Sequence, residues 1–197
     1  MRGVLIGLAV VAGLIVVGFM MFGGVYNSMV SSEERVKEAW AQVENVYQRR
    51  LDLIPNLVST VKGYAAHEKQ TLQAVVEARS SVAQMKVSSD VINNPDTMTQ
   101  FENAQKGLSS ALSRLLVVVE RYPDLKANQN FLALQTQLEG TENRIAVERR
   151  RFNDVAREFN TKIRVFPNNF LSGFFGFHPK AYFQSEEGAQ TAPKVTF

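Results

Sequence analysis

The side chains that could do chemistry in this sequence are few and widely spaced. There are two histidines, His67 and His178, and there is no cysteine. The pair His67-Glu68 lacks the second histidine of a zinc-protease motif, and His178 precedes a proline in an expected turn. Because a metal site needs convergent ligands, we expect a surface or structural role for both histidines.

Motifs for nucleophilic or phosphate chemistry are also missing from the sequence. The serine pairs at 80–81 and 109–110 have no histidine at helical spacing. There is no glycine-rich phosphate loop, dinucleotide fingerprint or nucleophile elbow. Without cysteine, disulfides, thiolate zinc sites and cysteine nucleophiles are excluded. The sequence therefore predicts a protein that is not an enzyme, with no catalytic residue, cofactor or metal.

Several polar residues interrupt the apolar seams of the expected helices. Arg50 occupies a core-type position and is followed by Asp52 and Asn56, while Asn153 and Asn160 each follow a seam phenylalanine. A buried arginine or asparagine must be hydrogen-bonded. We therefore expect these residues to form a structural polar network that fixes helix register. A binding site is the less favoured alternative, and an enzyme site around Arg50, Asn56 and Asn153 ranks last.

The first element that must position these residues is an apolar helix. After a short flank at residues 1–3, residues 4–23 contain no charged or strongly polar side chain. Twenty helical residues cover roughly 30 Å, the thickness of a bilayer core. Bulky residues at 19–22 do not resemble a signal-peptidase site. The sequence predicts an uncleaved transmembrane helix at residues 4–24 that contacts the lipid bilayer through residues 4–23.

The charges beside this helix suggest an orientation. Arg2 precedes the helix, and no basic residue follows it before Arg35. The positive-inside rule then predicts a cytoplasmic N-terminus. We expect a single-pass protein of a bacterial cytoplasmic membrane with an extracytoplasmic soluble domain.

Residues 25–166 show the heptad spacing of long helices that pack side by side as in a coiled coil. Pro55 predicts a kink or joint in the first helix, and the turn at 93–96 starts the second, with Asn94 as its cap. The last helix is expected from about Asn128 to Phe166. Together these predict an all-α, elongated antiparallel bundle of three long helices. Its main seam residues are Trp40, Tyr47, Ile54, Val61, Val75, Val82, Leu138, Ile145, Phe152, Phe159 and Phe166.

The C-terminal tail, residues 167–197, is rich in aromatic side chains and is expected to be non-helical because Gly173 and Gly176 disfavour a long helix. Three helices after the anchor would leave the tail far from the bilayer. We therefore expect the tail to pack partly on its own bundle and partly on a neighbouring copy. The predicted contact residues between copies are Phe170, Phe174, Phe175, Phe177, Tyr182 and Phe183.

The charge balance limits the class of partner. The formal net charge is +3, from 22 basic and 19 acidic side chains, which is too small to indicate nucleic-acid binding. The run at residues 149–151 contains three arginines, which we interpret as a solvated face. A lipid headgroup or an acidic partner is the sharper alternative for that run.

Three blocks of the sequence resemble the LemA family. They are AWAQVENVYQRRLDLIPNLVSTVKGYAAHEKQTL, YPDLKANQNFLALQTQLEGTENRIAVERRRFNDVAREFN and FFGFHPKAYFQSEEGAQTAPKVTF. The resemblance implies a membrane-anchored, largely helical domain without defined catalytic residues. One branch of the family is associated with magnetosome membranes, which implies a role in membrane organisation. The family is often drawn with its N-terminus outside, opposite to the orientation that Arg2 favours.

Two functions remain open from these observations. The first is a non-enzymatic scaffold that self-associates as a homo-oligomer at the membrane. The second is an adaptor or receptor that presents a helical surface to another membrane protein, such as a protease or a stress sensor.

Overall fold

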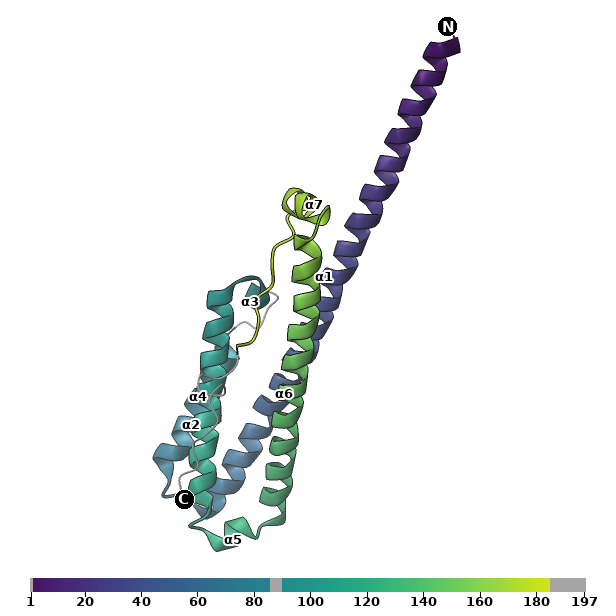
Figure 1. Ribbon diagram of the computed structural model, residues 1–197. Coiled ribbons are helices and arrows are strands. Elements are labelled where there is room, and N and C mark those ends of the chain that lie inside the picture. The colour runs from purple at the N-terminus through teal and green to yellow at the C-terminus, as the bar shows by residue number, and fades with distance from the viewer. Residues whose placement is uncertain (1, 86–89, 185–197) are drawn as a thin grey trace, which may run out of the picture.

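The computed structural model describes residues 2–85 and 90–184, and within them every regular element is a helix (Figure 1). The prediction of an all-α chain with a long apolar N-terminal helix is confirmed. The helices are α1 (Arg2–Tyr64), α2 (Lys69–Gln84), α3 (Asp90–Asn93), α4 (Pro95–Val119), α5 (Pro123–Lys126), α6 (Gln129–Arg164) and α7 (Asn168–Phe175).

The long helices form an antiparallel bundle in which α1 packs along α6 and α2 packs along α4 (Figure 1). The first part of α1 extends beyond the bundle as a single helix, so its large apolar side chains are exposed on all sides. This apolar stretch, residues 4–23, begins the one helix of the described chain that is long and apolar enough to cross a membrane.

Pro55 does not divide α1 into two helices, so the expected joint at that position is absent. The helix continues from Arg2 to Tyr64 with Pro55 inside it. Proline has no N–H, so the carbonyl of Leu51, four residues earlier, loses its helical donor. Arg79 of α2 supplies a replacement, since its Nε donates to the Leu51 oxygen at 3.0 Å. The defect in α1 is therefore used as a docking point for α2.

The first break in the helical chain lies at residues 65–68, between α1 and α2. The residue that breaks the heptad seam of the sequence, Glu68, lies in this turn and accepts a hydrogen bond from the hydroxyl of Tyr122 at 3.0 Å. The expected first helix is thus two antiparallel helices, and the bundle has four long helices rather than three. One additional reversal places the end of α6 at the same end of the bundle as the apolar stretch (Figure 1).

The core consists of two hydrophobic clusters along the bundle axis. The cluster nearer the apolar stretch is formed by α1, α3, α4, α6 and the tail, and it includes Trp40, Phe101 and Phe152. The distal cluster is formed by α1, α2, α4, α5 and α6, and it includes Ile54 and Leu115. Since α2 contributes no buried residue to the first cluster, the C-terminal segment takes the place of a fourth helix there.

Helix caps explain the boundaries of α4 and α6. The side chain of Asn94 accepts from the backbone N–H of Asp96 at 2.8 Å, with Pro95 in the first turn. The side chain of Asn128 accepts from the N–H of Phe131 at 3.0 Å. The first cap was predicted from the sequence, and the second agrees with the expected start of the last helix near Asn128. The main seam residues are buried with the exception of Phe166, which is 80% exposed.

The tail is not wholly non-helical, because α7 forms its first part. Gly176 ends this helix in the left-handed conformation, with φ of +75°, where other residues are strained. Gly173 lies inside this helix, and Gly176 limits it to eight residues. The tail also does not lie far from the apolar stretch, since the ring of Phe175 is 4.8 Å from that of Tyr26. Residues 185–197 of the expected tail lie outside the described residues.

Candidate functional site

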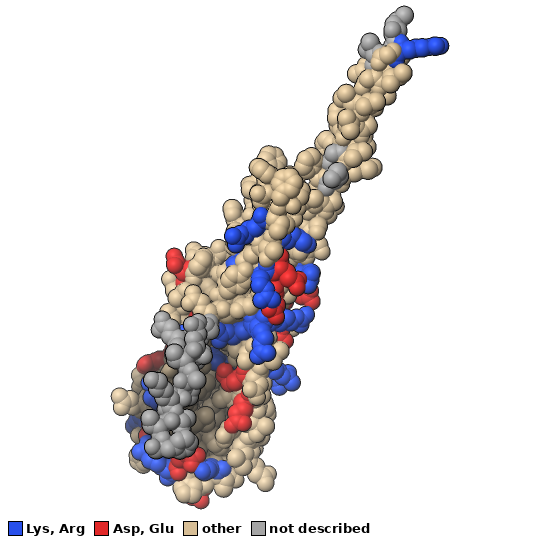
Figure 2. All heavy atoms as spheres, viewed as in Figure 1, with Lys and Arg blue, Asp and Glu red and all other residues tan. Residues whose placement is uncertain are grey.

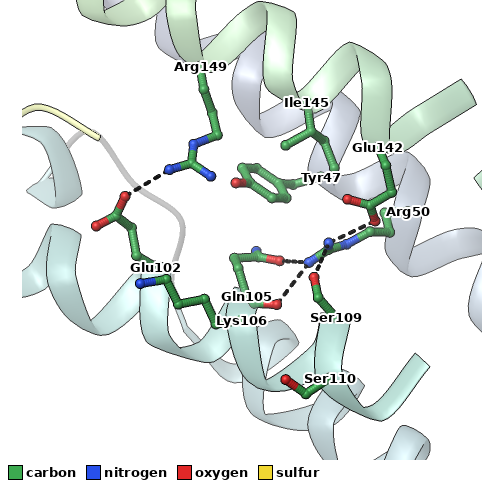
Figure 3. Close-up of a pocket in the computed structure, with 10 residues that line it drawn as sticks. All are labelled: Tyr47, Arg50, Glu102, Gln105, Lys106, Ser109, Ser110, Glu142, Ile145 and Arg149. Atoms are coloured by element: carbon green, nitrogen blue, oxygen red, sulfur yellow. Dashed lines mark hydrogen bonds and ion pairs between the residues drawn. The ribbon is translucent and has the colours of Figure 1, made fainter. Parts of the chain in front are cut away.

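A polar cleft of about 440 Å³ opens where α1, α4 and α6 meet, between the two hydrophobic clusters (Figure 3). It combines three basic side chains with two carboxylates and three hydroxyls. The lining residues are Tyr47, Arg50, Glu102, Gln105, Lys106, Ser109, Ser110, Glu142, Ile145 and Arg149.

Arg50 is the centre of this cleft and is only 2% exposed. One of its terminal nitrogens donates to the carboxylate of Glu142 at 2.9 Å and to the hydroxyl of Ser109 at 3.1 Å. The other donates to the side-chain oxygen of Gln105. A single guanidinium therefore connects α1 to α4 and α6, which fixes the relative register of three helices.

The aromatic ring of Tyr47 covers the guanidinium from the side of the first hydrophobic cluster. The ring centroid lies 5.4 Å from the central carbon of Arg50, within the range of a cation–π contact. Burial raises the pKa of the Tyr47 hydroxyl, so the tyrosine stays neutral beside the arginine at physiological pH.

Asp52 and Asn56 do not join this network, although the sequence predicted that they would. Both side chains are exposed, and Asp52 accepts instead from Gln48 on the same helix at 2.7 Å. Arg50 occupies the inward seam of α1, and positions two and six residues later point elsewhere on a helix of 3.6 residues per turn. The carboxylate that pairs with Arg50 comes from α6 and could not be inferred from local spacing.

Asn153 and Asn160 form a second polar assembly, which holds the C-terminal segment. Asn160 donates to the carbonyl of Lys180 at 2.9 Å and accepts from its N–H at 2.7 Å. Asn153 makes the same pair of bonds with Phe183, each at 2.9 Å. We call these two residues the asparagine clamp. Each of its amides supplies the donor and the acceptor that a neighbouring β-strand would supply.

The spacing of the clamp matches the two conformations that it joins. Seven helical residues separate Asn153 from Asn160, a rise of roughly 10.5 Å. Three extended residues separate Lys180 from Phe183, a span of about 10 Å. The heptad positions of α6 and the extended tail are therefore in register, so this segment lies straight along the bundle.

Two ion pairs close the ends of the clamped segment. Glu102 accepts from Arg149 at 3.1 Å and from the N–H of Gln184 at 3.1 Å. Lys180 is 7% exposed, and its ammonium group pairs with Glu33 at 2.6 Å. Arg149 is thus a structural residue and not part of a solvated face, whereas Arg150 and Arg151 are exposed.

The aromatic residues predicted to contact another copy fall into two groups. Phe177 and Phe183 are buried in the first hydrophobic cluster of their own chain. Phe170, Phe174 and Phe175 remain exposed on α7. Tyr182 is 41% exposed, and its hydroxyl accepts from Asn160 at 2.8 Å. Only the α7 residues and Tyr182 are therefore accessible to a partner.

Most polar groups of the cleft are paired with one another, and these pairs position the three helices. Both histidines are exposed, and neither lines the cleft. No cluster of histidine and acidic side chains suited to a metal ion occurs in the part of the chain that the structure describes. The hydroxyl of Ser109 is hydrogen-bonded to Arg50, a group that cannot act as a base. The sequence signals missed Glu33, Glu102, Glu142 and Lys180, whose partners all come from distant parts of the chain.

Known proteins resemble this chain over most of its length. It is 28% identical to magnetosome protein MamQ 2 of Paramagnetospirillum magneticum, covering 99% of this chain and 78% of that protein. It is 24% identical to protein LemA of Metamycoplasma hominis, covering 86% and 73%. Magnetosome protein MamQ of Magnetospirillum gryphiswaldense is 27% identical, with 87% and 68% covered.

None of these names is that of an enzyme. The sequence profile of the LemA family matches residues 39–197, which comprise the whole bundle beyond the start of α1. This range includes Arg50, the asparagine clamp and α7. With most of its length matched by that profile, the chain belongs to the LemA family.

Proposed function

We propose that this protein is anchored in a bacterial cytoplasmic membrane by α1 and acts there as a non-enzymatic scaffold made of several copies. The observation that carries the proposal is the continuity of α1. The exposed apolar stretch and the buried seam of the bundle belong to one uninterrupted helix, Arg2–Tyr64. A helix that is apolar on all sides needs lipid or protein around it.

This continuity makes the bundle a rigid extension of the membrane anchor. Residues 24–64 of α1 reach roughly 60 Å beyond the apolar stretch at the helical rise. The α1 seam packs against α6 along both hydrophobic clusters. The bundle and the membrane anchor are therefore joined by one rigid helix and not by a flexible linker. A structural role at the membrane requires such a rigid connection.

The proposed self-association uses the start of α1, where the apolar stretch begins. Gly3 and Gly7 are four residues apart on α1, a spacing that lets transmembrane helices approach closely. A side chain at either position would touch nothing else in the described chain. The names of the magnetosome relatives, which belong to the same family, agree with a role at a membrane system.

Extraction and cross-linking test the proposal in order. Alkaline carbonate should leave the protein in the membrane pellet, with an intact mass that includes the N-terminus. Release by carbonate would disprove the anchor.

Because the chain has no cysteine, Gly7→Cys provides a unique thiol on the glycine face, and Leu5→Cys provides a matched thiol on the opposite face.

We expect oxidation in membranes to give a homodimer with Gly7→Cys and little with Leu5→Cys. Equal cross-linking at both positions would indicate random collision and would argue against this interface.

Size-resolved extraction separates the two functions that the sequence left open. A large homo-oligomer supports the scaffold, whereas fixed co-purification of an unlike membrane protein supports the adaptor.

A further inference from the structure

The short helix α7 carries an exposed aromatic ridge. Phe166 is 80% exposed, Phe170 is 72% exposed and Phe174 is 83% exposed. The rings of Phe166 and Phe170 are 6.2 Å apart, and those of Phe174 and Phe175 are 5.1 Å apart. These four phenylalanines, which we call the aromatic ridge, form one continuous apolar surface instead of isolated exposed residues.

The opposite face of α7 fixes the ridge in this outward orientation. Ser172 is buried, and its hydroxyl donates to the carbonyl of Ile163 at 3.0 Å. Leu171 packs against the first hydrophobic cluster. The helix therefore cannot rotate to bury the ridge without losing these contacts, so the described part of the chain leaves the ridge uncovered.

The aromatic ridge lies beside the end of the apolar stretch of α1. The ring of Phe175 is 4.8 Å from that of Tyr26, and Lys162 donates to the carbonyl of Ser28 at 3.1 Å. Tyr26 is three residues beyond Gly23, a rise of roughly 4.5 Å. If residues 4–23 span the bilayer, α7 is at the level of the lipid headgroups (Figure 1).

The charges around the ridge are basic. The last turn of α6 contains Lys162 and Arg164, and residues 159–184 contain no acidic residue. On α1, the first acidic residue is Glu33. Figure 2 shows the same division, with charged side chains on the bundle and an uncharged surface toward the projecting helix. Aromatic residues next to lysine and arginine are typical of segments that lie in a membrane interface.

We infer that α7 and Phe166 insert into the headgroup and upper acyl region of the leaflet from which α1 emerges, with anionic lipid bound by Arg164. Arg164 is exposed and forms no ion pair with the described residues. This makes a second, in-plane membrane contact beside the span. The ridge faces lipid instead of a neighbouring copy, because lipid is the medium that surrounds α1 at this level.

The two contacts together fix the tilt of the bundle. A single helix through a bilayer allows the bundle to tilt, whereas a second attachment through α7, beside the span, limits that tilt. The inference rests on the proposed anchoring by α1, and the experiment is therefore arranged so that the two can fail separately.

Site-specific fluorescence quenching tests the inference on the full-length chain. A single cysteine labelled with an environment-sensitive dye is placed at Phe174→Cys or at Gly173→Cys. The second variant retains every aromatic residue, and a side chain at Gly173 would meet no neighbour in the described chain. The protein is reconstituted into vesicles of phosphatidylcholine and phosphatidylglycerol that contain nitroxide-labelled lipid.

Two further cysteines serve as controls. Ile15→Cys lies in the apolar stretch, and Val117→Cys is 70% exposed near the distal end of α4. We expect several-fold quenching at 173 and 174 by a nitroxide near the headgroup, and weaker quenching by one near the chain end. Ile15→Cys should be quenched more by the deep nitroxide, and Val117→Cys by neither.

The outcomes distinguish the inference from the proposed function. Quenching at 15 without quenching at 173 and 174 overturns the insertion of α7 and leaves the anchor intact. Protection at 174 from both lipid nitroxide and soluble iodide means that a second copy covers the ridge, and this also overturns the inference. Absence of quenching at 15 rejects the anchor itself.

Discussion

Arg50 shows how one side chain can join elements that the chain order keeps apart. Its partners on α4 and α6 are 55 to 92 residues away in sequence. The guanidinium lies between the two hydrophobic clusters. Its hydrogen bonds to α4 and α6 form only when all three helices are in the correct register. The residue therefore contributes specificity as well as stability.

Replacing Arg50 with alanine should lower the free energy of unfolding. A wholly buried ion pair would cost about 3–5 kcal/mol when one partner is removed. The side chain of Glu142 is 42% exposed and can be solvated, so we expect about 1–3 kcal/mol from unpaired Gln105 and lost packing. Chemical denaturation in mild detergent, followed by circular dichroism, measures the change.

The adjacent Arg49 provides the matched control, because it is the same residue type in the same helix but is exposed. Arg49→Ala should change the free energy of unfolding by less than about 0.5 kcal/mol. If both variants unfold at the same denaturant concentration, Arg50 does not stabilise the bundle.

Removing one amide of the asparagine clamp should release the C-terminal segment locally. In Asn160→Ala, the N–H of Lys180 loses its acceptor, and we expect faster hydrogen exchange there with little change within α6. Peptide-level exchange detected by mass spectrometry gives the readout. Asn143→Ala, an exposed asparagine of the same helix, should leave the exchange of residues 177–184 unchanged. Unchanged exchange in both variants would contradict the clamp.

The sequence anticipated part of this residue-scale arrangement. Seam positions indicated that Arg50, Asn153 and Asn160 needed partners, because an inward polar side chain must be hydrogen-bonded. The identity of those partners depends on which helices become neighbours. Glu142 and Glu102 on other helices, and the backbone of Lys180, could not be chosen from local spacing.

At the scale of elements, Pro55 and Arg79 form a matched pair. Proline removes one helical hydrogen bond, and arginine from α2 satisfies the carbonyl of Leu51 that is left free. This explains why α1 passes through Pro55 without ending. A partner from another helix can compensate a local defect that sequence rules treat as a break.

The pair predicts a measurable coupling between two substitutions. Arg79→Ala should destabilise the protein by about 1 kcal/mol, because the Leu51 carbonyl loses its donor. In the Pro55→Ala background, the helical N–H returns, and Arg79→Ala should cost markedly less. A double-mutant cycle on free energies of unfolding gives the coupling energy. Additive effects would show that Arg79 and the proline are independent.

The helix boundaries differ in how strongly the local sequence encodes them. The sequence predicted the cap at Asn94 and the start of the last helix near Asn128 correctly, because both signals are encoded within a few residues. The turn at 65–68 contains no proline and was missed, although Glu68 interrupts the seam there. Because of this additional reversal, the chain makes one more pass along the bundle than predicted. The tail therefore lies beside Tyr26 and not at the distal end.

At the scale of the whole molecule, the two ends of the bundle differ in character. The end with α7 and the apolar stretch is apolar, aromatic and basic, while the distal end is closed by α5 and the turn at 65–68 (Figures 1 and 2). This polarity is the arrangement expected of a domain that stands on a membrane. It results from an even number of passes after the anchor.

The charges on either side of the apolar stretch predict the orientation of the protein. With Arg2 before the apolar stretch and no basic residue after it until Arg35, we predict an extracytoplasmic bundle. Asp96→Cys, in the exposed first turn of α4, should react with a membrane-impermeant maleimide on intact spheroplasts. Labelling only after lysis would show that the bundle is cytoplasmic. The cysteine-free chain, treated with the same reagent, gives the background.

The proposed function requires that several copies of this chain form a scaffold in the membrane. The most direct measurement is the number of copies per particle, counted by stepwise photobleaching of a fluorescent fusion extracted with its surrounding lipid in copolymer nanodiscs. We predict that most particles contain two or more copies and no other protein in fixed proportion. Particles with one copy of the chain, or one copy bound to an unlike membrane protein, would contradict the account.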